Sequence, residues 1–118
     1  MGGLLRAKIV SKPWGREEIF AHTERYVGKF LIVDAGQTLS LQYHVKKDET
    51  LILIQGSVRL QIEEGGRMVE HTMKPGDVCR ILPGTRHRIE ATTDSRIVEV
   101  STPELDDVVR LEDRYGRV

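Results

Sequence analysis

Three side chains that can bind a metal ion lie close together in the middle of the sequence: Gln42, His44 and Glu49. Polar and apolar residues alternate over residues 39–44, which is the period-two pattern of a half-buried strand. Gln42 and His44 therefore project from one face, about 6.6 to 7 Å apart along the strand. The mainly polar residues 45–48 turn the chain, so that Glu49 returns beside His44. An amide oxygen, an imidazole and a carboxylate can then converge on one ion, and one more ligand is needed.

The flanking glycines make this stretch similar to the first motif of the cupin superfamily. Gly36, Gln42-Tyr43-His44, Glu49 and Gly56 have the spacing of that motif, although most cupins have histidine at the position of Gln42. The second cupin motif resembles Gly76-Asp77 followed by Pro83-Gly84-Thr85-Arg86-His87. Glu90 stands where many cupins have asparagine, at a position that is not a ligand. The resemblance implies that His87 is the fourth metal ligand.

Glutamine at position 42 resembles the mannose-6-phosphate isomerases, in which Gln, His, Glu and His bind the metal. Segments spread over residues 12–117 look like the C-terminal cupin domain of the type II enzymes: Lys12-Pro13-Trp14-Gly15 and residues 26–29, 39–44, 97–100 and 106–117. Those enzymes are often fused to a guanylyltransferase domain, which these 118 residues do not contain. The resemblance implies a cupin barrel, one divalent metal ion per chain, and a homodimer paired through strand edges.

Two imidazoles, one carboxylate and one amide oxygen suit several divalent metals. Zinc, iron(II), manganese, cobalt and nickel all accept such ligands, and zinc is our first expectation. His44, Glu49 and His87 alone would form the two-histidine, one-carboxylate face of a non-haem iron oxygenase. Gln42 as a fourth ligand would fill a position that oxygen and substrate share, which favours Lewis-acid chemistry.

This ligand set and the resemblance predict a metal-dependent aldose–ketose isomerase acting on a sugar phosphate, with mannose 6-phosphate and fructose 6-phosphate as the expected pair. The metal would polarise the carbonyl, and a general base would move a proton between neighbouring carbons. Glu99 and Glu90, on late strands, are the candidate bases. Two alternatives stay open: an oxygenase on the same barrel, and a metal-containing sugar-binding cupin without turnover.

A sugar phosphate requires cations near the metal, and three candidates fall in segments that resemble the isomerase domain: Lys29, Arg110 and Arg117. Arginine's planar fork suits a phosphate. Arg86 and Arg88 flank His87 on its strand and therefore face away from it. His22 and His71 fit neither motif and are expected at the surface.

Short strands separated by turns predict an all-β sandwich or barrel. We expect strands over residues 9–10, 17–21, 27–33, 39–44, 50–54, 58–63, 68–73, 78–82, 86–91 and 97–101. Pro103 and the acidic residues after it predict a short helical turn over residues 106–112. Residues 1–118 form a single cupin domain in this interpretation, with its core over about 27–101, an N-terminal arm over 1–26 and a C-terminal segment over 102–118.

The composition fits one domain and argues against several function classes. The 18 Lys and Arg balance the 18 Asp and Glu, so no broad field attracts nucleic acid or an anionic membrane. No apolar run approaches the ~20 residues of a membrane span, and the N-terminus lacks a signal-peptide core. The single Cys79 cannot form an intramolecular disulfide, so the cytoplasm is the expected compartment.

Overall fold

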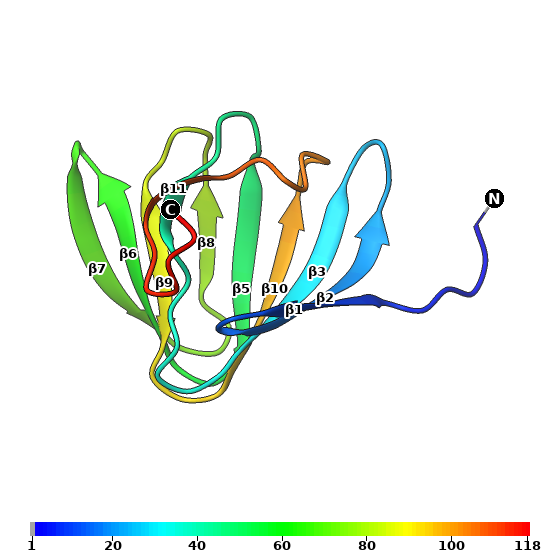
Figure 1. Cartoon of the computed structure of the whole chain (residues 1–118), viewed down its shortest axis with the longest axis horizontal. Coiled ribbons are helices and arrows are strands. Elements are labelled where there is room, and N and C mark those ends of the chain that lie inside the picture. Colours follow the sequence, from blue (N-terminus) through cyan, green and yellow to red (C-terminus); the bar gives the residue numbers. More distant parts are fainter. Residues whose placement is uncertain (1) are drawn as a thin grey trace.

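The computed structural model describes residues 2–118 as two antiparallel sheets with the core between them (Figure 1). The six-stranded sheet has the order β1 (Lys8–Lys12), β2 (Gly15–His22), β3 (Val27–Val33), β10 (Ser95–Ser101), β5 (Glu49–Gln55), β8 (Val78–Ile81). The five-stranded sheet has the order β11 (Val109–Glu112), β4 (Leu41–Tyr43), β9 (His87–Ala91), β6 (Val58–Glu64), β7 (Arg67–Met73). Over residues 2–118 the chain has no helix, and hence none that could cross a membrane. The predicted all-β class is confirmed.

The core fills the space between the two sheets because every second residue of the inner strands is apolar. On β5 the buried apolar residues are Leu51 and Leu53, and on β6 they are Val58, Leu60 and Ile62. Burying each such side chain contributes about 1.5 to 3 kcal/mol. The apolar layer fixes the register of the strands, since a slip by one residue would turn these side chains outward.

The last glycine of the first motif, Gly56, is required by the tight connection between β5 and β6. Its φ of 98° lies in the left-handed region that favours glycine. A Cβ at this position would collide with Asp94 and Ser95, which lead into β10.

The first two strands form a hairpin at one edge of the six-stranded sheet. Residues 8–22, most of the segment expected to be an N-terminal arm, are thus paired strands, and residues 2–7 precede them as an extension from the body (Figure 1). Trp14, at the turn of the hairpin, is 2% exposed and packs in the core. The hairpin is therefore held to the body by its own apolar turn.

The helical turn predicted over residues 106–112 is wrong. Val109–Glu112 is strand β11, which pairs with β4 and sets Arg110 opposite Gln42. Asp107, expected near the start of a helix, instead accepts hydrogen bonds from backbone N–H groups of the β4–β5 turn. Pairing with another strand therefore overrides the local signal from Pro103 and the acidic residues.

Candidate metal centre and its cavity

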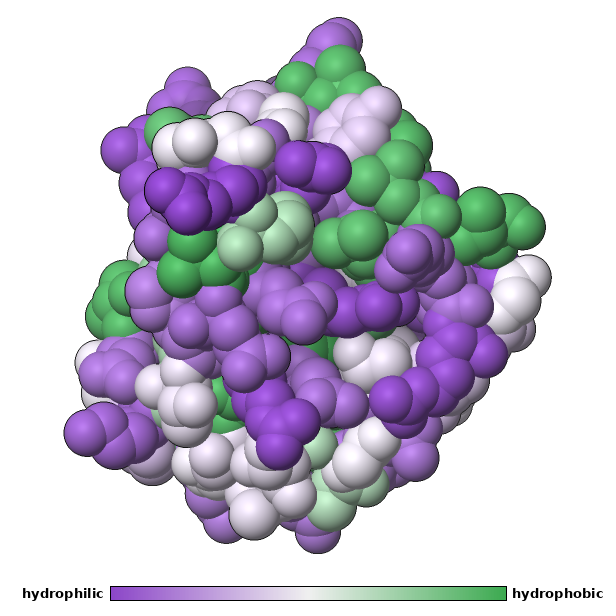
Figure 2. All heavy atoms as spheres, turned by 90° about the vertical axis from the view of Figure 1, so that its left-hand side faces the viewer, coloured by the Kyte–Doolittle hydropathy of each residue, from purple (hydrophilic) through white to green (hydrophobic). Residues whose placement is uncertain are grey.

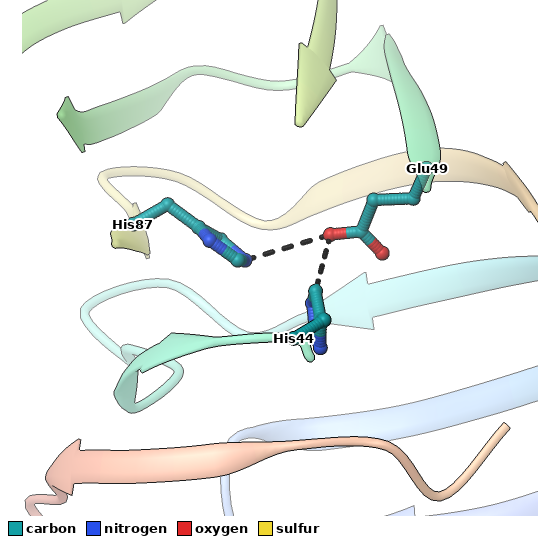
Figure 3. Close-up of side chains that lie close together, drawn as sticks. All are labelled: His44, Glu49 and His87. Atoms are coloured by element: carbon teal, nitrogen blue, oxygen red, sulfur yellow. Dashed lines mark hydrogen bonds and ion pairs between the residues drawn. The ribbon is translucent and has the colours of Figure 1, made fainter. Parts of the chain in front are cut away.

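Three of the four predicted ligands meet between the sheets (Figure 3). His44 follows β4, Glu49 begins β5 and His87 begins β9. Glu49 Oε1 lies 3.2 Å from His44 Nε2 and 3.5 Å from His87 Nε2. Ligand atoms about 2.0 to 2.2 Å from one tetrahedral ion would be separated by roughly 3.4 Å. The three buried side chains therefore have the separation that a single metal ion requires.

The outer nitrogen of each imidazole is fixed by a backbone carbonyl. His44 Nδ1 lies 2.6 Å from the Asp107 carbonyl oxygen, and His87 Nδ1 lies 2.9 Å from that of Thr85. A carbonyl only accepts, so each Nδ1 carries a hydrogen and each Nε2 faces Glu49. An imidazole whose Nδ1–H is held by a carbonyl is oriented to bind a metal through Nε2. The donor set thus fits a metal ion.

Glu49 is held in its ionised form. Burial raises its pKa, but the contacts with the His44 and His87 rings and the charge of Lys47 outweigh burial and hold the pKa well below its ordinary value. Metal ions bind the deprotonated carboxylate. Glu49 is therefore in the protonation state that a metal ligand needs.

Gln42, the fourth predicted ligand, lies beside this group. It is opposite His87 in the β4–β9 pair and lines the same cavity, because residues directly opposite in an antiparallel pair share a face. Its Oε1 accepts a hydrogen bond of 2.6 Å from Ser40 Oγ. An amide oxygen has two lone pairs, so one stays free for a metal. Ligation by Gln42 remains a prediction.

We expect Gln42→Leu to weaken zinc binding by roughly 10- to 100-fold, because leucine removes the oxygen and keeps the volume. Gln42→His should retain the metal, since imidazole binds the same ions. Competition with a chelator of known affinity measures both effects. Zinc affinity in Gln42→Leu equal to that of the parent would show that the glutamine is not a ligand.

The ligands open into a cavity of about 460 Å³ between the sheets, a volume typical of small-molecule sites. Its walls carry buried charge beyond the ligands. Lys29 Nζ lies 2.9 Å from Glu17 and 3.9 Å from Glu99, while Lys47 Nζ lies 3.2 Å from Glu49 and 3.5 Å from Glu99. The cavity is therefore built to hold a polar ligand.

Lys47 is a site residue that the sequence interpretation missed. It is 5% exposed and joins the ligand Glu49 to Glu99. Burial lowers the pKa of Lys47, but the charges of Glu99 and Glu49 outweigh burial and raise it, so the amine stays protonated. In the sequence Lys47 follows another lysine in a polar turn, which looks like a solvated loop.

The chain is similar to a described family over nearly its whole length. The family profile described as Mannose-6-phosphate isomerase C-terminal matches residues 5–113. This chain belongs to that family. Among its relatives, the mannose-1-phosphate guanylyltransferase ManC of Salmonella typhimurium is 33% identical over 114 residues, and that of Escherichia coli is 31% identical over 114 residues. Each alignment covers 92% of this chain but 23% of the relative, so the chain spans less than a quarter of these proteins.

Solved structures confirm that this family member has the cupin fold. KdgF from Halomonas sp. superposes with a TM-score of 0.72 at 22% identity, covering 86% of this chain and 91% of that one. Oxalate decarboxylase from Bacillus subtilis superposes with a TM-score of 0.75 at 18% identity, covering 93% of this chain and 33% of that one. The motif spacing predicted a cupin that resembles the C-terminal domain of the isomerases, and this prediction is confirmed.

Of the two candidate bases of this cupin, one lines the cavity between the sheets and the other lies on the outer face of the five-stranded sheet. Glu99 is 4% exposed and lines the cavity. Burial, followed by the charge of Glu49, raises its pKa against the opposing effect of Lys29 and Lys47. Glu90 alternates with Ile89 and His87 on β9 and so points outward. The prediction of Glu90 as a candidate base is therefore wrong, because Glu90 does not line the cavity.

Glu90 lines a separate hollow of about 380 Å³ on the outer face of the five-stranded sheet. There it lies 3.3 Å from Arg59 and 3.5 Å from Arg114. Arg88 lines the same hollow and Arg86 pairs with Glu63, so neither arginine belongs to the metal cavity, as predicted. Hydrophilic side chains occupy the middle of the face shown in Figure 2.

The remaining predicted residues divide by their partners. Arg117 lines the cavity but is bound by Asp113, whose pKa its guanidinium lowers to about 2. Arg110 also lines the cavity, and its Nε is buried without a hydrogen-bond partner among residues 2–118. His22 and His71 are exposed, as predicted. Arg110 is thus the better placed of the two arginines to bind an anion.

Asp107 is a second residue that the sequence interpretation missed. Its carboxylate accepts hydrogen bonds from the N–H groups of Val45, Lys46 and Lys47, at 3.0, 2.7 and 2.9 Å. Its carbonyl also accepts the bond from His44. One residue of the C-terminal segment therefore shapes the turn between two ligands and orients one of them. Gly84 N–H donates to the other side of this turn, at the His44 carbonyl.

Asp107→Ala is expected to destabilise the fold by about 1 to 2 kcal/mol and to weaken zinc binding roughly 10-fold. The hydrogen bond from Lys46 N–H, with those from Val45 and Lys47, lowers the pKa of Asp107. Its contribution to stability is therefore present above the ordinary pKa of about 3.9 and is lost as the pH falls through the lower value of the folded state.

Urea unfolding from pH 3 to pH 7 measures this effect, with Asp106→Ala as the control. Asp106 immediately precedes Asp107 in the chain and is exposed. Asp107→Ala should lose part of the acid dependence that the parent shows. The same unfolding curve in parent and Asp107→Ala at every pH would contradict the assigned role.

Proposed function

We propose that this chain is a metal-dependent isomerase of a sugar phosphate that interconverts mannose 6-phosphate and fructose 6-phosphate. The observation that carries the proposal is the position of Glu99. A buried carboxylate that is not one of the predicted ligands lines the same cavity as a donor set suited to a divalent metal. Family membership and relatives named for mannose 1-phosphate chemistry support a phosphorylated sugar as the substrate.

Gln42, His44, Glu49 and His87 would hold the metal, with zinc as the first choice. When bound, such an ion supplies a Lewis acid for the carbonyl of the open-chain sugar. Glu99 then removes the proton from C2 of the aldose and returns it to C1, while the hydroxyl proton moves from O2 to O1. The product is the ketose, and no atom is gained or lost.

The other cavity residues keep Glu99 and the sugar in place. Lys47 and Lys29, at 3.5 and 3.9 Å, flank Glu99 and compensate its charge beside Glu49. The apolar wall, which includes Leu51 and Ile89, excludes bulk water from the carbon that loses its proton. Arg110, with its unpartnered Nε, is a donor for the phosphate.

We expect Arg110→Ala to raise KM for mannose 6-phosphate by roughly 10- to 100-fold, the effect of losing a charge-assisted hydrogen bond of about 1.5 to 3 kcal/mol. The metal content should not change, because Arg110 contacts no ligand atom that the structure records. Steady-state kinetics with elemental analysis test this. An unchanged KM would remove Arg110 from the substrate site.

The proposed reaction is tested by incubating the zinc-, manganese- and cobalt-loaded protein with mannose 6-phosphate and following fructose 6-phosphate by NMR. Turnover without oxygen supports the proposal. Tight binding of the sugar phosphate with no turnover would replace it with a metal-containing sugar-binding cupin. Consumption of oxygen in the iron-loaded protein would replace it with an oxygenase.

A further inference from the structure

The cations of the metal cavity fall into two groups according to their partners. Lys29, Lys47 and Arg117 each lie within 3.5 Å of a carboxylate oxygen. Lys8, Lys12 and Arg110 line the same cavity, and within residues 2–118 no ion pair involves them. The first group is neutralised inside the protein. The second group is available to an anionic ligand.

Lys8 reaches the cavity because of the alternation on β1. Lys8, Val10 and Lys12 line the cavity, whereas Ile9 and Ser11 between them do not. Strand β1 is the edge of the six-stranded sheet, so its inward side chains lie at the border of the cavity. Lys8 is exposed, as a residue at such a border must be.

The register places Lys8 in line with the candidate base. Lys8 is opposite Ile19 on β2, Ile19 is opposite Lys29 on β3, and Lys29 is opposite Glu99 on β10. Residues that are successively opposite one another form a row across a sheet. Lys8 is therefore the outermost member of the row that contains Glu99. Lys12 lies about 13 Å farther along β1.

Arg110 has the corresponding position on the other sheet. Strand β11 is the edge of the five-stranded sheet, and its Arg110 is opposite Gln42, which is opposite His87. Arg110 is thus the outermost member of the row that contains two predicted ligands. The row of Lys8 continues from Glu99 to Leu51 on β5, two positions from Glu49 on the same strand. Glu49 in turn contacts His87 of the row of Arg110.

We infer that Lys8 and Arg110 form a two-sided clamp for one anionic group, the phosphate of the sugar phosphate, at the border of the cavity. This inference rests on the proposed function and adds to it a binding residue on the first strand. The carboxylates nearby do not compete for the clamp. Glu17 is bound by Lys29, and Asp107 by three N–H groups. Asp113 lies close enough to Arg110 for the charge of Arg110 to help lower its pKa, but both of its oxygens are bound by Arg117. Asp106 is exposed and stays in water.

The clamp is tested by dissociation constants of the full zinc-loaded chain for mannose 6-phosphate, inorganic phosphate and mannose, measured by calorimetry or NMR titration. Lys8→Gln should raise the dissociation constants of mannose 6-phosphate and of phosphate by roughly 10-fold and leave that of mannose unchanged. Lys12→Gln, which removes the same charge from the same strand and cavity, should change all three by less than about 2-fold. Lys8→Arg should restore most of the affinity, because it keeps the charge.

The double variant Lys8→Gln/Arg110→Gln separates one clamp from two independent sites. If both cations hold one phosphate, the fold-increase in the dissociation constant of the double variant should differ clearly from the product of the fold-increases of the two single variants. A fold-increase equal to that product would overturn the shared clamp. Equal losses in Lys8→Gln and Lys12→Gln would also overturn it, since they would report only the net charge.

The clamp and the isomerase can fail separately. If the parent isomerises mannose 6-phosphate and Lys8→Gln has the parent KM, the function stands and the clamp is wrong. If Lys8→Gln weakens phosphate binding but the parent has no turnover, the clamp stands and the isomerase is wrong. Equal binding of mannose and mannose 6-phosphate by the parent would overturn the clamp.

Discussion

Glu49→Ala and His87→Ala are each expected to remove the metal from the isolated protein. Glu49 lies 3.2 Å from His44 and 3.5 Å from His87, and among residues 2–118 no other His, Cys, Asp or Glu belongs to this group, so no such residue is in place to substitute for a lost ligand. Removing residues that only orient a ligand costs about 10- to 100-fold in affinity, and removing a ligand itself should cost more than about 100-fold. Elemental analysis after dialysis, with chelator competition, measures the loss.

His22→Ala and His71→Ala provide the matched controls for this loss. Both histidines are exposed and neither lines the cavity; His71 pairs with Glu64 at 2.8 Å. These two variants should keep one metal ion per chain. Glu49→Gln, which preserves the shape, guards against misfolding of the alanine variant. Full metal occupancy in both Glu49→Ala and His87→Ala would contradict the proposed metal centre.

The ligand positions could be predicted because they follow from short-range patterns. Alternation places Gln42 and His44 on one face, and a turn of a few residues returns the chain at Glu49. The same rule excluded Arg86 and Arg88 from the cavity. It also excludes Glu90, which differs from His87 by an odd number of positions on one strand and therefore faces outward.

Lys47 and Asp107 could not be found in this way, because their roles depend on contacts between distant segments. Asp107 binds the turn that precedes Glu49 from sixty positions away along the chain, and Lys47 is buried only because Glu99 of β10 lies against it. Strand β11 is a third case. Pro103 and acidic residues favour a helix locally, whereas the free edge of β4 provides backbone partners that no local pattern reveals.

Glu99→Gln should lower kcat for mannose 6-phosphate by about 10²- to 10⁴-fold, the usual contribution of a general base. Glutamine keeps the size of the side chain but cannot accept and return a proton. The substitution also leaves Lys29 and Lys47 less well neutralised, so the melting temperature must be measured alongside the kinetics. Metal content and KM should stay close to the parent values, because Glu99 is neither a predicted ligand nor part of the anion site.

Exchange of the substrate's C2 proton with deuterium from the solvent separates a base from a residue that only supports the fold. A base passes that proton to solvent whenever it releases it before the return to C1, so the parent should incorporate deuterium and Glu99→Gln should not. Glu90→Gln is the matched control, since Glu90 lies on the outer face and pairs with Arg59 and Arg114. It should exchange and turn over like the parent. Undiminished deuterium incorporation by a folded, metal-loaded Glu99→Gln protein would show that a group other than Glu99 removes the proton.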